Sequence, residues 1–380
     1  MQADGVGSKP KPENKMQKSA RPSWKGKYKG MKEIMCDFEN LYRAYRKAKS
    51  GKKYNGSTAR FELMSLEGIH LLKEQLENRT YKMAPYNEFS IYEPKERVIK
   101  SCTFKDKVVQ HCFCDNILMP RLSGVFITDN YAGQIGKGTL FGLDRLKFHM
   151  LEYYKENGLN GWILKCDISK FFYTIDHEVL RDIVDYYFPE EYAKWINEIF
   201  VDSTENPGVP LGNQAAQAYA LLMLHGMDCM ITGEFGIYRY GRYMDDFFLI
   251  HHNKEYLKDV LAAVGEMVES LGLSLNGKTQ IVPFRKGITF LGFQHYITSE
   301  GKYIRKIRGE NKRRIRKKIR NWIKAVKNKK MTEEKFLEKY NAWKNHASHG
   351  NCKKLCASMD EFVKELMENA NICAGANKGE

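Results

Sequence analysis

The chain has no long apolar run and no pattern of paired cysteines. No stretch of about eighteen apolar residues occurs in its 380 residues, so the sequence predicts no membrane-spanning helix. The N-terminal residues also lack the hydrophobic segment that is typical of a signal peptide. The nine cysteines are odd in number and scattered, which favours a reducing compartment over a disulfide framework. We therefore expect a cytoplasmic protein that does not bind a membrane.

Large apolar residues are nearly absent from residues 1–30, which carry eight Lys or Arg and two acidic residues. This composition predicts a disordered basic arm, because it buries too little surface to offset the lost chain entropy. A second basic segment lies between Lys302 and Lys330, where fifteen Lys or Arg face the single Glu310. The net charge of +16 is therefore concentrated in two segments.

The second basic segment has the pattern of an amphipathic helix. Its apolar residues fall on one helical face, namely Ile315, Ile319, Trp322, Ile323 and Val326. Such a helix can pack by its apolar face while its basic face binds a nucleic-acid backbone. A membrane-surface helix and a merely solvated face are the alternative interpretations.

Two adjacent acids, Asp245 and Asp246, lie between an aromatic-rich run and an apolar run. Two strands joined through this pair would form a hairpin with both acids at its tip. Neighbouring strand residues point to opposite faces, so we expect Asp245 to bind a metal directly and Asp246 to act from farther away. An ordinary turn is the alternative, because Asp is a common turn former.

A third acid, Asp167, ends an apolar run over 161–168 that predicts a buried strand. A strand-end or helix-capping Asp is the alternative interpretation. If the fold joins Asp167 to the acidic pair, the three could organise two divalent ions about 3.5–4 Å apart for nucleotidyl transfer. Magnesium suits such a site because it prefers carboxylate and phosphate oxygens.

The tetrapeptide Tyr-Met-Asp-Asp at 243–246 resembles the catalytic motif of reverse transcriptases, which are RNA-directed DNA polymerases. Further segments are similar to that family's motifs, in the family's order, at 93–110, 161–172, 208–217, 273–280 and 289–293. The loop with Leu211 and Ala216 resembles bacterial enzymes of the diversity-generating retroelement, retron and phage-defence groups. The resemblance implies an α+β right-hand polymerase with an antiparallel palm sheet and a basic helical thumb.

The resemblance also implies a division into subdomains. After the arm at 1–30 it places the fingers with N-terminal helices at 31–150, the palm at 151–300 with room for a fingers insertion near 175–210, and the helical thumb and tail at 301–380. The thirty residues after 350 are too few for an RNase H or endonuclease domain.

The resemblance assigns roles around the acids. The implied metal site consists of Asp167, Ile168, Asp245 and Asp246. Phe172, with Phe171 beside it, would lie under the sugar and exclude a ribose hydroxyl, although both could be core aromatics. Leu211 and Gly212 would contact the nucleotide and template, and an apolar Leu211 predicts looser base selection.

Basic residues complete the implied site. Arg97 and Lys100 would hold the triphosphate, with a charged surface strand as the alternative. Lys278 would act as a general acid, or it is a solvated turn lysine. The residues expected to contact nucleic acid are Lys137, Gln217, Gly292, Arg313, Arg316 and Arg320.

The implied cofactors are two Mg²⁺ ions, with Mn²⁺ as a substitute. The implied partners are an RNA template and primer, dNTPs, the cDNA product and, in a diversity-generating retroelement, a small basic accessory protein. The expected function is RNA-templated DNA synthesis, with low fidelity in such a retroelement. The alternatives are a retron or phage-defence enzyme, an intron maturase and an RNA-binding descendant of a polymerase.

A cluster of His and Cys residues lies near the C-terminus, at His346, His349, Cys352 and Cys356. Structural zinc sites usually gather two ligand pairs separated by a longer loop. We therefore favour a thumb segment over a zinc site.

Overall fold

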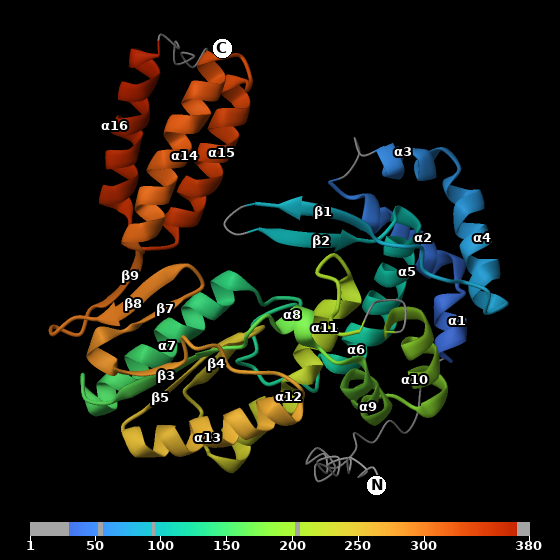
Figure 1. Cartoon of the computed structure of the whole chain (residues 1–380), viewed down its shortest axis with the longest axis horizontal. Helices are drawn as coiled ribbons and strands as arrows, with labels where there is room; N and C mark the ends of the chain where they lie inside the picture. The colour runs from blue at the N-terminus through green and yellow to red at the C-terminus, as the bar shows by residue number, and fades with distance from the viewer. Residues whose placement is uncertain (1–29, 52–55, 93–95, 202–205, 371–380) are drawn as a thin grey trace, which may run out of the picture.

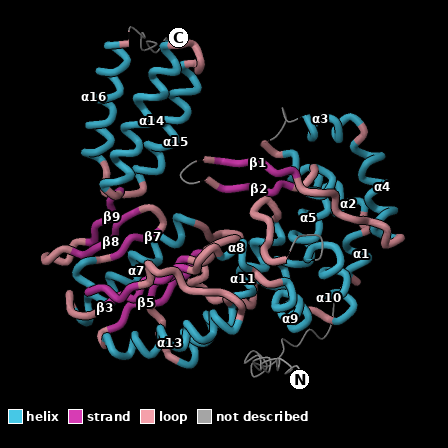
Figure 2. The backbone as a smooth tube through the Cα atoms, in the orientation of Figure 1, coloured by secondary structure: helices cyan, strands magenta, loops and turns pink. Residues whose placement is uncertain are grey.

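The computed structural model describes residues 30–51, 56–92, 96–201 and 206–370 (Figures 1 and 2). Nearly all of the predicted basic arm lies outside these residues. The described chain combines many helices with antiparallel sheets, which confirms the α+β prediction. Within the described ranges, every helix is too short or too polar to cross a bilayer.

The N-terminal part is mainly helical and carries one exposed hairpin. Its elements are α1 (Met31–Met35), α2 (Phe38–Lys49), α3 (Gly56–Leu63), α4 (Ser65–Glu77), β1 (Asn87–Ile91), β2 (Arg97–Ser101), α5 (Phe104–Phe113), the π-helical turn η2 (Cys114–Leu118) and α6 (Met119–Leu122). Asp37 and Thr103 start α2 and α5 by accepting a hydrogen bond from a backbone N–H three residues on. All of β1 is exposed, so the β1–β2 hairpin extends away from the core (Figure 1).

The middle of the chain folds around a four-stranded sheet. Its elements are α7 (Thr139–Asn157), β3 (Trp162–Asp167), α8 (Phe171–Thr174), α9 (His177–Tyr187), α10 (Glu190–Ile196), η3 (Asn197–Val201), α11 (Gln214–Met223), α12 (His225–Cys229), η4 (Met230–Glu234), β4 (Tyr240–Tyr243), β5 (Asp246–His251), α13 (Lys254–Ser270), β6 (Gln280–Pro283) and η5 (Phe284–Lys286). The strand order is β4-β5-β3-β6. Neighbouring strands are antiparallel throughout, as predicted for the palm.

Helices cover both faces of this sheet, because residues along a strand point alternately to its two sides. On one face Phe248 and Ile250 of β5 pack with Met150 of α7. On the other face Phe247 and Leu249 belong to the cluster that contains the buried residues of α13. The apolar runs around the acids are therefore buried strands, and the acids lie where those strands end.

The C-terminal part consists of a small sheet and a three-helix bundle. Its elements are β7 (Ile288–Phe290), β8 (Phe293–Ile297), β9 (Tyr303–Ile307), α14 (Gly309–Lys327), α15 (Glu333–Ser348) and α16 (Lys353–Asn369). The predicted apolar stripe is confirmed: Ile315, Ile319 and Ile323 are buried in the bundle, and Trp322 and Val326 pack against them. Figure 1 shows the bundle standing on one side of the molecule, and the β1–β2 hairpin extending toward it from the N-terminal part on the other side.

One buried cluster runs from α1 to the loop after α13, so the N-terminal and middle parts share a core. Helix α7 passes through residue 150, and β8 pairs with β9 across residue 300. Helix α9 and the turn η3 lie in the segment near 175–210 and belong to the shared core. The subdomain limits stay predictions.

Candidate active site

The acidic pair lies at the turn between β4 and β5, as predicted. Strand β4 ends at Tyr243, Met244 and Asp245 form the turn, and Asp246 begins β5. Met244 has a φ of 55°, a left-handed conformation that is uncommon for a side chain other than Gly. The turn therefore presents two acids from a backbone that the surrounding residues must hold in place.

Strand pairing brings Asp167 to this turn. Asp167 ends β3 and is the direct partner of Asp246 across the β3–β5 ladder. Opposite residues in such a ladder have Cα atoms about 4.5–5.5 Å apart. Asp245 is one residue further, so its Cα lies within about 9 Å of that of Asp167. Acids that are far apart in the sequence thus converge, and Asp245 as the direct metal ligand stays a prediction.

The segment just before β6 supports Asp167 from the other side. The backbone N–H of Asn276 donates to the Asp167 carbonyl (2.7 Å), and its side-chain amide donates to the Asp167 carboxylate (3.4 Å). Ile168 is buried and forms an isolated bridge with Leu275. Lys278 is exposed two residues beyond Asn276, and its role as a general acid stays a prediction.

Lys165, which the sequence analysis did not select, lies among the acids. Its ammonium forms an ion pair with Asp246, donates to the Cys166 carbonyl (3.2 Å) and lies 5.4 Å from the centre of the Phe290 ring. Burial lowers the pKa of Lys165 to about 8, although the nearby charge of Asp167 acts to raise it. Its position two residues before Asp167 on the same strand face was the signal in the sequence.

A second cation, Arg242, lies behind the turn and was also missed. Arg242 and Asp228 are both fully buried, and the guanidinium forms a two-pronged ion pair with the carboxylate. The hydroxyl of Tyr240 donates to the same carboxylate (2.6 Å). Asp228 gave a signal in the sequence, because it is a single acid in an otherwise apolar segment and a fully buried charge requires a partner. Arg242 gave none, because other charged residues lie close to it in the sequence.

The aromatic pair after Asp167 divides between core and cavity. Phe171 is buried in the main core, as a core aromatic would be. Phe172 is half-buried and lines a cavity of about 120 Å³ together with Lys100 and Leu211. Three residues assigned to the nucleotide are thus gathered around one space. This arrangement fits the predicted sugar selection, which stays a prediction.

Gly212 makes a close approach to the backbone of β2, and its predicted contact with the nucleotide stays a prediction. A Cβ at Gly212 would lie 2.4 Å from the carbonyl oxygen of Lys100, so only glycine fits against β2 there. Lys100 also forms an ion pair with Glu88 across the hairpin (3.3 Å). Arg97 begins β2, and its side chain lies outside the described part of the structure.

The residues predicted to contact nucleic acid lie in several places. The half-buried Lys137 donates to the carbonyls of Ile127 (3.1 Å) and Asn130 (3.0 Å), so its ammonium pins a loop. Burial lowers its pKa. Gln217 is exposed on α11 beside a second cavity of about 220 Å³, which Leu211 also lines.

The other predicted contacts lie in the C-terminal part. Gly292, with a φ of 87°, turns the chain from β7 to β8. Phe293 stacks on His346 of α15, with ring centres 4.8 Å apart, so this turn touches the helical bundle. The three predicted arginines of α14 are all exposed, and two of them lie over the ring of Phe362: these are Arg313, Arg316 and Arg320.

Among the described residues, no three His, Cys, Asp or Glu side chains form a ready-made metal site. Neither the acidic trio nor the cluster from His346 to Cys356 does so. Magnesium is commonly held by one or two carboxylates plus substrate phosphates and water, so a trio without a closed cage still fits it. The ion pair of the Lys165 ammonium with Asp246 shows that this carboxylate can accommodate a cation.

The chain matches one protein family and is similar to several solved structures. Residues 92–295 match the family described as reverse transcriptase (RNA-dependent DNA polymerase). A search of curated proteins found no match. Among solved structures, apo telomerase from Candida tropicalis is similar at 12% identity and a TM-score of 0.47, covering 59% of this chain and 49% of that one. Telomerase from Candida albicans with a fragment of telomeric RNA is similar at 12% identity and a TM-score of 0.46, covering 78% and 62%. The chain thus spans about half to three fifths of those telomerases.

Proposed function

Because the chain belongs to the reverse transcriptase family of RNA-dependent DNA polymerases, we propose that it extends a primer with deoxynucleotides on an RNA template. The pairing of Asp167 with Asp246 beside the turn at Asp245 carries this proposal. With this pairing, the acids of two separate segments would lie within reach of one reacting phosphate. A right-hand polymerase fold provides this arrangement.

Asp167, Asp245 and Asp246 would hold two divalent ions, for which Mg²⁺ is the natural choice and Mn²⁺ a substitute. When bound, the ions supply activation of the primer 3′-hydroxyl and neutralise charge on the leaving pyrophosphate. The side chain of Asn276 orients the Asp167 carboxylate. Ile168 and Lys278 remain proposed contributors, as backbone neighbour and proton donor.

The cavity lined by Phe172, Lys100 and Leu211 would receive the sugar of the incoming nucleotide. A ring at Phe172 would leave no room for a ribose 2′-hydroxyl, and Lys100 with Arg97 would neutralise the triphosphate. The exposed basic face of α14 would bind the template–primer backbone. RNA as the template, dNTPs as substrates and cDNA as the product are the partners proposed here.

Primer extension on an RNA template tests this function. The full chain is given dNTPs or NTPs with Mg²⁺, and Asp245→Ala is the matched inactive variant. DNA synthesis by the wild type alone supports the proposal. Extension with NTPs only would indicate an RNA polymerase, and RNA binding without extension by either would indicate a maturase or a non-enzymatic RNA-binding protein.

Sugar selection has its own variant. Phe172→Val removes the ring while keeping an apolar side chain, so ribonucleotide incorporation should rise by roughly tenfold or more. Unchanged discrimination in a variant that still uses dNTPs would remove Phe172 from this role.

We further propose that the enzyme belongs to a diversity-generating retroelement and copies its template with low fidelity. Leu211 supports this, because it lines both cavities beside the predicted nucleotide site with an apolar side chain. Misincorporation opposite template adenine should fall in Leu211→Gln, and equal error rates would contradict the proposal.

Neighbouring genes provide a second test. A gene with a variable repeat, and one for a small basic accessory protein, would support a diversity-generating retroelement. A retron RNA or a toxin gene would indicate retron or phage-defence function. A cytoplasmic location stays a prediction.

A further inference from the structure

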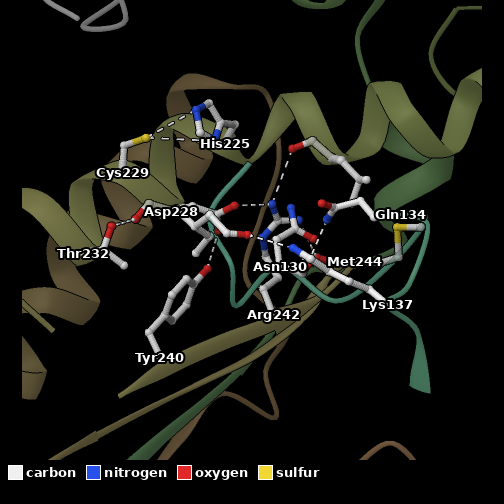
Figure 3. Close-up of polar contacts among 12 residues, drawn as sticks. Asn130, Gln134, Lys137, His225, Asp228, Cys229, Thr232, Tyr240, Arg242 and Met244 are labelled. Atoms are coloured by element: carbon white, nitrogen blue, oxygen red, sulfur yellow. Dashed lines mark hydrogen bonds and ion pairs between the residues drawn. The ribbon is translucent and has the colours of Figure 1, made fainter. Parts of the chain in front are cut away.

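The buried pair of Asp228 and Arg242 connects the core of the middle part to the turn that carries the acids. Figure 3 shows Arg242 between Asp228 on one side and Met244 on the other. Asp228 lies on α12, whereas Arg242 and Met244 belong to β4 and the turn after it. The pair therefore joins a helix to the residue directly before Asp245.

Each nitrogen of the Arg242 guanidinium has an assigned partner. Nε and Nη2 donate to the two carboxylate oxygens of Asp228, and Nη2 also approaches the Leu221 carbonyl (3.4 Å). Nη1 donates to the carbonyl of Met244 (3.0 Å). A planar guanidinium fixes these directions relative to one another, which a single ammonium cannot do.

The hydrogen bond to the Met244 carbonyl matters because the backbone of Met244 is left-handed. Left-handed backbone at a residue other than Gly costs roughly 1–3 kcal/mol and persists only where the surroundings determine it. The Met244 carbonyl belongs to the peptide that leads into Asp245. A donor held rigidly against this carbonyl therefore sets the direction in which the next residue leaves the turn.

The backbone of Arg242 is anchored as well. Its N–H donates to the Asp129 carbonyl (2.9 Å), and its own carbonyl accepts from the N–H of Tyr131 (2.9 Å). The loop that contains Asp129 and Tyr131 is itself held in place, because Lys137 and Gln134 both donate to the Asn130 carbonyl (Figure 3). These backbone contacts fix the position of Arg242 independently of the contacts that its side chain makes with the turn.

Stability alone does not account for such a pair. Removing two charges from water costs several kcal/mol for each ion, and apolar residues of similar volume often replace a buried pair without loss. A geometric task does account for it, since an apolar side chain offers no donor to the Met244 carbonyl.

We propose that Asp228 and Arg242 are positioning residues for the metal-binding turn, holding Asp245 in register with Asp167 through the Met244 carbonyl. Neither residue touches the substrate or the metal in this role. This inference rests on the proposed function, which gives the turn its metal-binding role. The contacts of Arg242 alone carry the geometric part of the inference.

The central test uses the double variant Asp228→Leu with Arg242→Met in the full chain. Both charges are removed together, so no unpaired charge is left. The buried Tyr240 hydroxyl loses its acceptor, so the thermal midpoint should fall moderately but less than in a variant that removes one charge alone. Mn²⁺ binding is measured without substrate by electron paramagnetic resonance. We expect affinity to fall by about 10–100-fold, as when other supporting partners of metal ligands are lost. Wild-type affinity in the folded double variant would overturn the proposal.

Arg242→Lys provides the second variant in case the double variant does not fold. It keeps a positive charge for Asp228, but one ammonium cannot serve both Asp228 and the Met244 carbonyl. Weaker Mn²⁺ binding at a near-normal thermal midpoint supports the proposal, and unchanged binding contradicts it. A pair that only joined α12 to β4 would lower the midpoint and leave Mn²⁺ affinity as it was.

The matched control is Tyr81→Phe, which removes a hydrogen bond to another buried aspartate, Asp106 (2.7 Å), far from the turn in the sequence. It should lower the thermal midpoint and leave Mn²⁺ affinity unchanged. Primer extension by the wild type is run alongside. If that extension fails while the Mn²⁺ differences remain, the proposed function is wrong and the positioning role is retained.

Discussion

The middle part of this chain contains two acid–base pairs that differ chiefly in their access to solvent. Asp228 and Arg242 are fully buried, and every guanidinium nitrogen has a partner. Asp246 and Lys165 lie at the end of the strands, where the side chains are 29% and 14% exposed. The first pair is therefore enclosed by protein groups, whereas solvent reaches the second, and we expect the cation of the second pair to be exchangeable.

The difference follows from where Arg242 and Asp246 lie along the β4–β5 hairpin. Arg242 lies inside β4 and is enclosed by α12 and the loop before α7, while Asp246 is the first residue of β5. A charge inside a sheet must be satisfied by protein groups. A charge at a strand end can exchange its partner for a metal or a phosphate. One pair can thus hold the turn while the other remains available for chemistry.

The largest effect is expected when one member of the buried pair is removed. Asp228→Ala leaves the Arg242 charge buried and unpaired, so we expect the free energy of unfolding to fall by about 3–5 kcal/mol. Urea denaturation followed by circular dichroism measures this loss. Asp246→Ala, assayed in parallel, should lose much less stability; equal losses would mean that the two pairs do not differ as described.

The reverse contrast is expected in activity. Asp246→Ala removes one carboxylate of the proposed metal site, and we expect primer extension to fall about thousandfold, equivalent to roughly 4 kcal/mol of transition-state stabilisation. Single-turnover extension on an RNA template measures the rate. Glu255→Ala, which removes an exposed acid from the same part of the chain, is the control and should behave as wild type. A mildly impaired Asp246→Ala enzyme would contradict a role for this acid at the metals.

Local patterns predicted part of this site. Apolar runs next to acids predicted the buried strand and the hairpin, and helical spacing predicted the stripe of α14. The convergence of Asp167 with the acidic pair was expected from the resemblance to reverse transcriptases, because these acids are far apart in the sequence, and Lys165 was not selected. The pairing of Asp228 with Arg242 joins a helix to a strand, so spacing alone does not reveal it.

The roles given to Lys137 and Gly212 show a second reason. Lys137 was assigned to nucleic acid and Gly212 to the nucleotide by their place in a motif, and both assignments stay predictions. In this structure Lys137 donates to backbone carbonyls and Gly212 fits against Lys100. A basic or glycine residue beside an active site can thus support the protein as well as a ligand. Sequence shows that the residue is present, and only the packing shows what it touches.

Asp129 is a partly buried acid next to Arg242, and its pKa predicts how the stability of the fold depends on pH. Burial alone would raise the pKa of Asp129, but hydrogen bonds from His149 and Arg145 lower it to about 2. Its pKa is thus lower folded than unfolded, so the stability it adds is present above about pH 4 and is lost as the pH falls toward 2. We expect about 2 kcal/mol from this group. Urea unfolding between pH 5 and pH 3 should show a smaller decline for Asp129→Asn than for the wild type; parallel declines would contradict this.

The smallest expected effect concerns Lys165, and it tests whether the open pair is a competitor of the metal. Lys165→Met removes the ammonium from Asp246 and keeps a long apolar side chain over the Phe290 ring. Without that positive charge, Mn²⁺ should bind about tenfold more tightly, or about 1.4 kcal/mol. Lys254→Met is the matched control, because Lys254 lies over Trp162 at the opposite end of the same strand. Titration with Mn²⁺ distinguishes the outcomes: tighter binding in Lys165→Met alone shows an exchangeable cation, whereas weaker binding would place Lys165 with Arg242 as a support of the acids.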